Sequence, residues 1–356
     1  MATTKNSLPI LPEWFTEGVV SSFRAGISSV FILHGDVTCL VPNPNGEVEP
    51  KYPYIPLQEL FARVFDEREM VIFYNIATGM RFLRPEMEKE FRKIADPGST
   101  EEAPKDPVAA AKADLAAKRQ LPREPELCLP LIEKVLQKMD SVALIIDSAH
   151  FIAPESTNTG ILLNERIHIA RLRAWAQDAR VKKRSNIVLL LTDLAVKISG
   201  ELRQTSSRIA TVFIPKPSSE ERMCYVERLT KGVPEQQEIE SQISALEKKR
   251  TRARGASTDT TTSEIGLLQE QLKKFPSHFE VPDDFDINVF VNATQGMSLR
   301  QILEIFRFAN QAGRPIDLSL VKEKKKEMLN AEYGDVMEVA DPQWNLEEIG
   351  GLAKPK

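Results

Sequence analysis

Apolar residues gather in five short runs along the 356-residue chain, and the runs are rich in β-branched side chains. The runs are Ser29–Leu33, Met70–Tyr74, Val142–Ile146, Ile187–Leu191 and Thr211–Ile214. Hydrophobicity is continuous within each run rather than alternating, which is typical of strands that are covered on both faces, as in a parallel sheet. The pattern therefore predicts five buried strands.

Helical patterns lie between these runs. Large apolar residues recur three or four positions apart in Pro56–Phe65, Pro125–Met139 and Ile161–Ala179. Alternation of strands and helices predicts a doubly wound α/β core, which we place at residues 1–217.

Only helical patterns follow Pro217, and they predict a small helical lid domain at residues 218–333. The expected helices are Ser218–Lys231, Asp286–Ala293, Ser298–Ala312 and Asp317–Ala331. The first begins with Ser-Ser-Glu-Glu, which offers a capping hydroxyl and acidic residues in the first helical turn.

Two insertions interrupt this plan. Asp96–Glu124 is rich in Ala, Lys, Glu and Pro and predicts a disordered loop with a transient helix. Pro234–Lys274 carries apolar residues at helical spacing on both sides of a polar linker, which predicts a projecting antiparallel helical hairpin. The alternative for this segment is a disordered loop with some helix.

Composition narrows the class of partner. A net charge of −4 gives no general attraction to nucleic acid or to an anionic membrane. Cys39, Cys128 and Cys224 are widely spaced, so they form neither a disulfide framework nor a zinc pattern, as expected in a reducing cytosol. No apolar run approaches the roughly 18–20 residues of a membrane helix. We therefore expect a soluble, cytoplasmic protein with no membrane contact, and the charge argues against nucleic acid as a partner.

Polar residues end two of the predicted strands. Asp147 follows Val142–Ile146, and a carboxylate at the carboxyl edge of a parallel sheet can hold the water shell of Mg²⁺ beside a phosphate. Thr192 ends Ile187–Leu191 in the same way. Any buried strand can also end on a polar residue for purely structural reasons.

A phosphate-binding loop is missing from the sequence. No G-x-x-x-x-G-K-[ST] motif occurs anywhere in the chain. After the first run, Gly35-Asp36 stands between two apolar segments and predicts a tight β-hairpin turn instead. Asn75–Phe82 predicts a similar hairpin after the second run.

The order of these features resembles the AAA+ ATPase family from about residue 10 to residue 352. The matching pieces are the strand that ends at Asp147, the strand end at Thr192, the arginine-bearing stretch Glu201–Arg222, the turn Gly296-Met-Ser298 and the terminal Trp344…Ile349-Gly-Gly-Leu352. The resemblance implies a five-stranded, mainly parallel P-loop-NTPase-like core followed by a small helical lid. It also makes residues 334–356 a linker to a following AAA module.

The resemblance implies roles for five residues. Asp147 would belong to the Walker B strand and contact Mg²⁺, Thr192 would be sensor 1, and Arg300 would be sensor 2. Arg203 or Arg208 would be the arginine finger, which neutralises charge on the phosphoryl group in a neighbouring subunit. Surface arginines that cap helices or form ion pairs are the structural alternative.

Two departures from the family pattern weaken the expectation of catalysis. The Walker A loop is absent, and Ser148 stands where an active AAA+ ATPase has a glutamate that polarises water. A serine hydroxyl is not a base at neutral pH without a partner. We therefore expect a degenerate N-terminal module of a tandem AAA protein that binds no cofactor tightly. ATP and Mg²⁺ are expected in the following module.

The resemblance implies assembly, regulation or partner docking within a protein-remodelling or unfolding ATPase. The expected partners are further copies of the chain or a second AAA module, and a protein client or adaptor at residues 234–274. One alternative is a weakly ATP-binding module that uses Asp147, Thr192 and Arg300 and is completed by neighbouring subunits. Another is a nucleic-acid-processing relative that uses the basic segment Lys248–Arg254.

Overall fold

The computed structural model describes residues 11–45, 52–95, 120–155, 162–252, 258–275, 278–282 and 284–333. These residues divide into two compact units, with the boundary between Lys216 and Pro217. Most of the insertion at 96–124, the segment 334–356 and part of Lys248–Arg254 lie outside the described residues.

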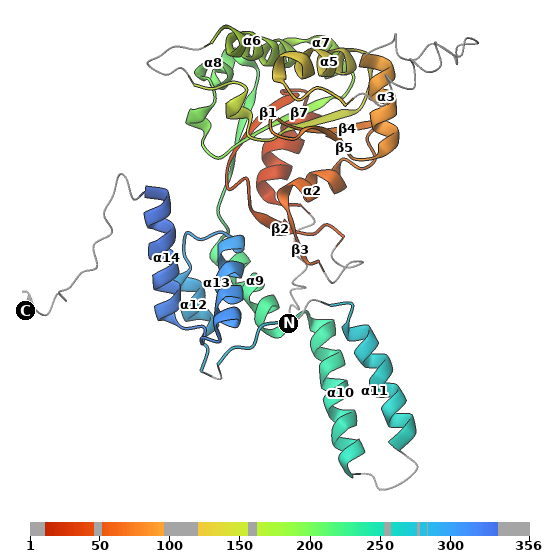
Figure 1. Ribbon diagram of the computed structural model, residues 1–356, viewed down its shortest axis with the longest axis vertical. Coiled ribbons are helices and arrows are strands. Elements are labelled where there is room, and N and C mark those ends of the chain that lie inside the picture. The colour runs from red at the N-terminus through yellow and green to blue at the C-terminus, as the bar shows by residue number, and fades with distance from the viewer. Residues whose placement is uncertain are drawn as a thin grey trace, which may run out of the picture. The chain divides into compact units, whose positions relative to one another are not determined.

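The N-terminal unit is built around a six-stranded sheet (Figure 1). Its strands, in spatial order, are β5 (Gly79–Phe82), β4 (Met70–Asn75), β6 (Val142–Ile146), β7 (Ile187–Thr192), β1 (Val30–Gly35) and β8 (Ala210–Ile214). All neighbours are parallel except β4 and β5, which are antiparallel. The five predicted strands and the mainly parallel α/β fold are confirmed.

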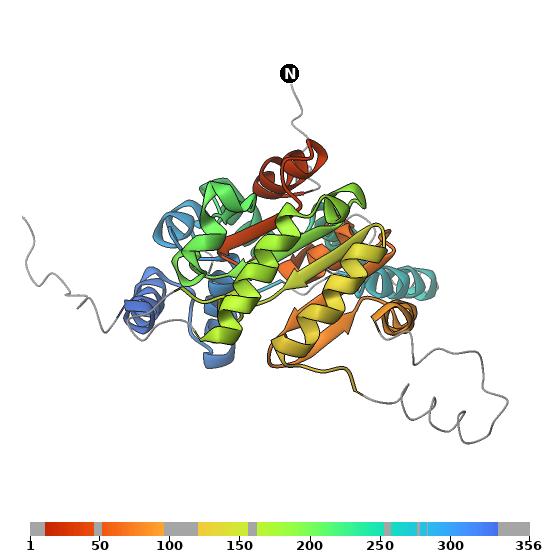
Figure 2. The same cartoon turned by 90° about the horizontal axis from the view of Figure 1, so that it is seen from above.

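Helices cover both faces of this sheet. Figure 2 shows α5 (Pro125–Lys138) and α6 (Leu163–Gln177) lying across one face, and the short α7 (Ala179–Lys183) and α8 (Gly200–Arg203) belong to the same layer. The other face is covered by a π-helix, η1 (Trp14–Ser21), with α1 (Ser22–Arg24), and by α2 (Leu57–Val64) (Figure 1). A further helix, α3 (Pro85–Ala95), follows β5 and packs against it and α5.

Burial explains why the apolar runs form strands. Every residue of β6 and of β7 is buried, since both lie inside the sheet and between the two helical layers. The sixth strand, β5, is not one of the five apolar runs and was predicted only as the returning part of the hairpin at Asn75–Phe82. It is a short edge strand with mixed burial, so its sequence lacks the continuous apolar pattern.

The two predicted hairpins have different outcomes. The hairpin at Asn75–Phe82 is confirmed, because β4 and β5 are antiparallel and pair Asn75 with Gly79 next to the turn. The hairpin predicted at Gly35-Asp36 is wrong. Since β1 already pairs with β7 on one side and β8 on the other, no edge of β1 remains for a returning strand. The following strand, β2 (Leu40–Pro42), pairs instead with β3 (Tyr54–Pro56) in a separate antiparallel ladder.

The C-terminal unit is helical. It contains α9 (Ser219–Lys231), α10 (Pro234–Arg252), α11 (Thr258–Leu272), α12 (Ile287–Ala293), α13 (Leu299–Ala312) and α14 (Leu318–Tyr333). Its centre includes the aromatic pair Phe290 and Phe306, whose ring centroids lie 5.4 Å apart. Ser218 with Glu221 and Ser298 with Gln301 form reciprocal capping boxes at the starts of α9 and α13. The α10 and α11 helices contact each other as an antiparallel pair (Figure 1).

Candidate functional site

The carboxyl edge of the six-stranded sheet brings the candidate residues of the N-terminal unit together. Strand register places His34 of β1 opposite Thr192 of β7, and Ile146 of β6 opposite Leu190 of β7. Asp147 therefore follows a strand that is adjacent to the strand ending in Thr192. In open α/β sheets this edge is where ligands bind.

The carboxylate of Asp147 is held by neutral side chains of its own chain. Oδ2 accepts hydrogen bonds from Gln58 Nε2 at 3.2 Å and from Asn75 Nδ2 at 3.1 Å. Oδ1 accepts a longer hydrogen bond from Ser148 Oγ at 3.4 Å. Both oxygens are thus engaged without a cation, although neutral donors of this kind are weaker partners for a carboxylate than a charged group is.

Gln58 occupies the first turn of α2, the helix that follows β1 in the chain. In a phosphate-binding loop, a lysine and a hydroxyl residue stand at the start of the corresponding helix. Here the first residues are Leu57, which is buried, and Gln58, whose amide reaches Asp147. Gln58 could not be predicted from the sequence, because no local pattern relates it to an aspartate 89 positions away.

The backbone after β1 has few N–H groups free for a phosphate. The Gly35 N–H donates to the Asp193 carbonyl at 3.0 Å, and the Asp36 N–H donates to the Ile214 carbonyl at 3.1 Å. The Val37 N–H donates to the Gly35 carbonyl and the Cys39 N–H to the Asp36 carbonyl. A phosphate cradle needs several such groups to converge on one point. Four N–H groups of this turn are bonded to carbonyl oxygens of the chain instead.

Gly35 itself is fixed by its neighbours. Its φ is +109°, in a region that residues with a Cβ rarely adopt. A Cβ at this position would also lie 2.4 Å from the Ile214 carbonyl oxygen and 2.8 Å from the ring of Phe213. The glycine therefore serves the close approach of β1 and β8, and this requirement explains its presence without any ligand.

Thr192 is buried, and its hydroxyl is occupied within the chain. Oγ1 lies 3.1 Å from Nδ1 of His150 and donates to the Leu194 carbonyl at 3.2 Å. Burial lowers the pKa of His150, and burial likewise lowers the pKa of His34. Both histidines are therefore neutral near neutral pH.

Asp193 follows Thr192 and forms an ion pair with Lys197. Partial burial acts to raise the pKa of Asp193, but hydrogen bonds from Lys197 and from the Leu194 N–H outweigh it, and the pKa is lowered. No group of three or more His, Cys, Asp or Glu side chains is arranged to hold a metal ion in the part of the chain that the structure describes.

The two finger candidates differ in their surroundings. Arg203, in α8, donates to Glu155 at 2.6 Å and to the Ile198 carbonyl at 3.0 Å, so its guanidinium is engaged within its own unit. Arg208 is exposed and directly precedes β8, at the amino edge of the sheet. Its backbone is left-handed, with φ of +64°, and its guanidinium has no hydrogen bond or ion pair with any described residue.

Arg300 lies in the C-terminal unit. It occupies the first turn of α13, after the Ser298 cap, and it is exposed. Among described residues its side chain has no hydrogen-bond or ion-pair partner. A positive charge in a first helical turn is opposed by the helix dipole, so the helix itself gives no reason for this arginine.

An apolar rim borders the carboxyl edge, and the sequence did not indicate it. We define the apolar rim as Phe151, Leu194, Val196 and Phe213, each of which is more than half exposed. Each of its aromatic members lies beside a histidine: the rings of His34 and Phe213 are 5.3 Å apart, and those of His150 and Phe151 are 4.3 Å apart.

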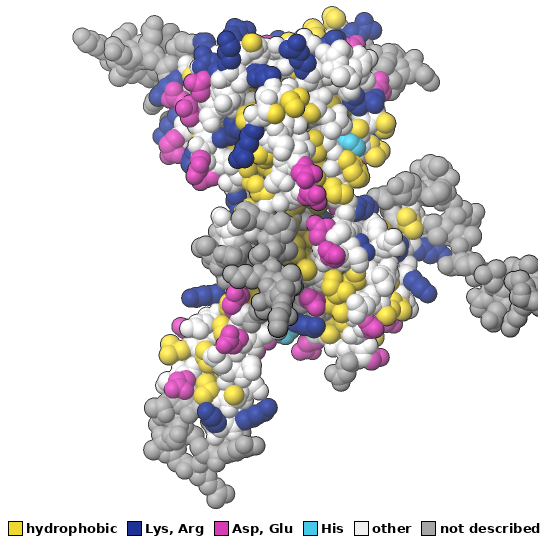
Figure 3. Space-filling view, turned by 180° about the vertical axis from the view of Figure 1, so that it is seen from behind, with side chains coloured by type: hydrophobic (Ala, Val, Ile, Leu, Met, Phe, Trp, Pro, Cys, Tyr) yellow, Lys and Arg dark blue, Asp and Glu magenta, His cyan; other side chains and the backbone are white. Residues whose placement is uncertain are grey.

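The space-filling view shows hydrophobic side chains exposed on one face of this unit (Figure 3). Contiguous exposed apolar surface is characteristic of interaction sites. The only sequence signal would have been large apolar residues directly after two predicted strands.

The helical layer of α6 and α7 is basic, in contrast to the chain as a whole. Figure 3 shows Lys and Arg side chains gathered at the top of the N-terminal unit. The basic residues from 162 to 186 are Arg166, Arg171, Arg173, Arg180, Lys182, Lys183 and Arg184. Several are paired, as Arg171 is with Glu133 and Arg184 with Asp140.

None of the described helices is long and apolar enough to cross a membrane.

Comparison with protein families identifies both units. Residues 4–215 match the family model of the AAA+ chaperone N-terminal Rossmann-like domain, and residues 269–334 match that of the AAA+ chaperone second helical domain. Most of the α10–α11 hairpin lies between the two matches. No curated protein matches the chain. The first match alone covers more than half of the sequence, and with the parallel sheet it confirms the resemblance: the chain belongs to the AAA+ chaperone family.

Proposed function

We propose that this chain is a degenerate AAA+ module that does not hydrolyse ATP and instead serves assembly, regulation or partner docking in a protein-remodelling machine. The observation that carries the proposal is the turn after β1, where the N–H groups of Gly35, Asp36, Val37 and Cys39 are bonded to carbonyl oxygens of the chain. A triphosphate would have to displace these bonds. The motif absent from the sequence and the engaged backbone thus point the same way.

The residues around Asp147 support the same proposal. In an active site this carboxylate would hold the water shell of Mg²⁺, and a neighbouring glutamate would polarise water. Here Gln58 and Asn75 donate to Asp147, and Ser148 follows it. These residues fit a site that is closed by its own side chains. They do not fit ATP with Mg²⁺, so no catalytic step is assigned to them.

The apolar rim supports the assembly part of the proposal. Its four large side chains are exposed around the closed site, and a stable interface buries on the order of 800 Å² on each partner around an apolar centre. We assign the rim to contact with a neighbouring subunit or module. Hydrolysis, where the assembly performs it, would use another nucleotide site.

Arg208 is our choice for the arginine that acts on a neighbouring subunit. Arg203 would have to leave Glu155 and the Ile198 carbonyl before it could reach out of its own unit. Arg208 needs no such rearrangement, because it is exposed and unpaired among the described residues. An arginine that acts in trans remains useful even when its own module binds no nucleotide.

Sedimentation velocity with the full chain tests the assembly role. We expect self-association with and without ATP and Mg²⁺, and a loss of about tenfold or more in affinity for Leu194→Asp with Val196→Asp, since charges then enter the rim. Leu127→Asp is the matched control, because Leu127 is similarly exposed but lies on α5. A monomeric chain, ATP-dependent association or an unaffected rim variant would contradict the proposal.

The alternative, a weakly ATP-binding module completed by neighbouring subunits, has one observation in its favour. Asp147 and Thr192 lie at the ends of adjacent strands, as a working site would require. Single-turnover hydrolysis by the assembled chain distinguishes the two. Phosphate release above background that is lost in Asp147→Ala would favour the alternative.

A further inference from the structure

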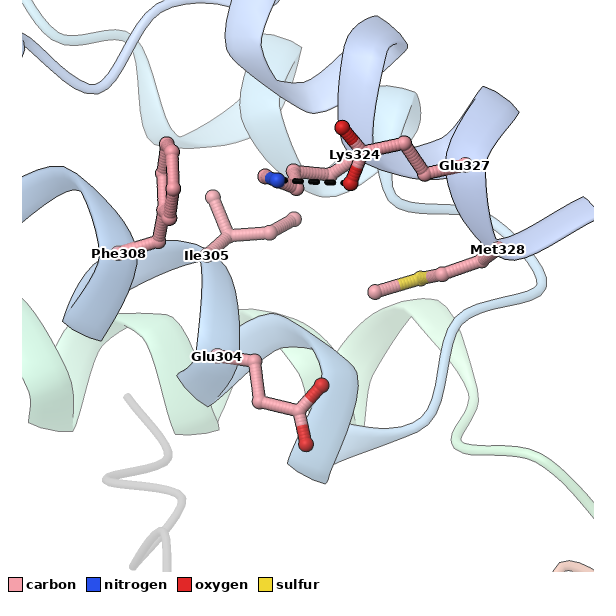
Figure 4. Close-up of a pocket in the computed structure, with 6 residues that line it drawn as sticks. All are labelled: Glu304, Ile305, Phe308, Lys324, Glu327 and Met328. Atoms are coloured by element: carbon pink, nitrogen blue, oxygen red, sulfur yellow. Dashed lines mark hydrogen bonds and ion pairs between the residues drawn. The ribbon is translucent and has the colours of Figure 1, made fainter. Parts of the chain in front are cut away.

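A groove of about 390 Å³ lies between α13 and α14 in the C-terminal unit (Figure 4). Its lining residues are Glu304, Ile305 and Phe308 of α13 and Lys324, Glu327 and Met328 of α14. The volume is near the lower end of the roughly 300–1,000 Å³ of ligand pockets. A space of this size can take one or two large side chains.

Apolar side chains form the interior of the groove. Figure 4 shows Ile305 between Phe308 and Met328, so that the two helices present an apolar strip to the space between them. Ile305 belongs to the buried core of the unit, whereas Phe308 is 36% exposed. An exposed phenylalanine beside a flexible methionine is typical of surfaces that adapt to a partner's side chain.

Two of the three charged side chains that line the groove form an ion pair, and the third does not. The Lys324 ammonium lies 2.7 Å from the Glu327 carboxylate and 4.0 Å from the centre of the Phe308 ring. The positive charge of Lys324 is therefore paired with Glu327, and its ammonium group lies against the aromatic face. Glu304, across the groove, has no hydrogen bond or ion pair with any described residue. The unpaired charge among the residues that line the groove is thus the carboxylate of Glu304.

We propose that this groove binds a peptide segment of a partner protein in which a large apolar side chain stands next to a lysine or arginine. The apolar side chain would pack against the exposed Phe308 and the partly exposed Met328. The cation would pair with Glu304. An acidic segment is disfavoured, because its carboxylates would approach Glu304 and Glu327. The mode is that of a short segment in a groove between helices. This site goes beyond the proposed assembly role, which concerns the N-terminal unit.

Selection of displayed peptides that bind the full chain tests the proposal. A library of random peptides about three helical turns long is selected on the wild type and, in parallel, on Phe308→Asp. We expect the peptides enriched on the wild type alone to share an apolar residue beside Lys or Arg. Synthesised, they should bind Phe308→Asp about tenfold more weakly, by fluorescence anisotropy.

A charge-matched pair of variants tests the role of Glu304. We expect Glu304→Gln to weaken the selected peptides about threefold to tenfold, with the loss shrinking at high salt. Gln311→Lys makes the same change in net charge at an exposed position of the same helix and should leave affinity unchanged. Phe308 and Glu304 are both solvent-accessible, so circular dichroism and the melting temperature should show that the variants are folded.

Four outcomes would overturn the proposal. Selected peptides could bind Phe308→Asp as well as the wild type, or they could carry Asp or Glu beside the apolar residue. A change in sedimentation of Phe308→Asp would assign the groove to a second copy of the chain. Tighter peptide binding after deletion of residues 334–356 would assign it to that segment of the chain.

Discussion

The two edges of the central sheet use polar side chains in different ways. At the amino edge, the buried Asn186 donates to the Leu136 and Met139 carbonyls at 2.8 and 3.0 Å and accepts from the Val142 N–H at 2.7 Å. At the carboxyl edge, Asp147 bonds instead to side chains, those of Gln58 and Asn75.

A buried backbone group left without a partner cannot turn to water, whereas a partly exposed side chain can. The amino edge is therefore built for the fold. The carboxyl edge keeps polar groups that the fold does not need.

Removing Asn186 from the amino edge should destabilise the protein more than any other change considered below. Asn186→Ala removes the partner of the buried Leu136 carbonyl, of the buried Val142 N–H and of the partly buried Met139 carbonyl. The free energy of unfolding should therefore fall by about 3 kcal/mol in urea denaturation. Asn164→Ala is the control, because Asn164 is exposed and its amide bonds to the Glu126 side chain, and it should change stability by less than about 0.5 kcal/mol. A loss below about 1 kcal/mol for Asn186→Ala would remove the contrast between the edges.

A smaller effect is expected at the carboxyl edge. Asp147→Ala should lower the free energy of unfolding by about 1 kcal/mol or less, since Gln58, Asn75 and Ser148 are each partly exposed and can bond to water. The same denaturation experiment measures it. If Asp147→Ala cost as much as Asn186→Ala, the carboxyl edge would be part of the structural framework.

The pH dependence of stability should also be assigned to the carboxyl edge. Burial lowers the pKa of His34 and of His150 below 6.5, so the unfolded chain takes up protons first as pH falls. The stabilisation from these neutral histidines is present above about pH 6.5 and is lost as pH falls through their lowered pKa values.

The melting temperature should therefore fall between about pH 7 and pH 5, and fall less in His34→Gln with His150→Gln. The carboxylates with lowered pKa values, such as Asp178, titrate in a separate window below about pH 4. Equal pH dependence in the variant and the wild type would show that other groups are responsible.

The smallest effect concerns Arg208. Its left-handed backbone costs a residue with a Cβ roughly 1–2 kcal/mol, and glycine avoids that cost but loses more entropy on folding. Arg208→Gly should leave stability unchanged or raise it by up to about 1 kcal/mol. In an assembly that hydrolyses ATP, Arg208→Gly should slow ATP turnover. If Arg208→Gly instead lowered the stability of the chain, the arginine would serve the fold.

Predicting the fold from sequence succeeded where burial leaves a local signature. Strands covered on both faces, such as β6 and β7, are continuous apolar runs and were located. The edge strand β5 has no such run. The turn at Gly35 was wrongly assigned because the occupancy of both edges of β1 depends on β7 and β8, which are remote in the chain.

The candidate site was only partly predictable for the same reason. Asp147 and Thr192 end recognisable strands, so their positions on adjacent strands followed from the pattern. The contacts of Gln58 with Asp147 and of Arg203 with Glu155 join residues 89 and 48 positions apart, and no sequence period encodes them. In the proposed function, the first contact closes the site around Asp147, and the second is the reason for preferring Arg208 to Arg203.

Equilibrium titration with a fluorescent ATP analogue and Mg²⁺ measures whether the carboxyl edge of the sheet can bind nucleotide. The engaged N–H groups after β1 and the Gln58–Asp147 contact predict no saturable binding in the micromolar range. They also predict the same result for the wild type and Asp147→Ala. Saturable, Mg²⁺-dependent binding at micromolar concentration that disappears in Asp147→Ala would contradict the account of a closed nucleotide site.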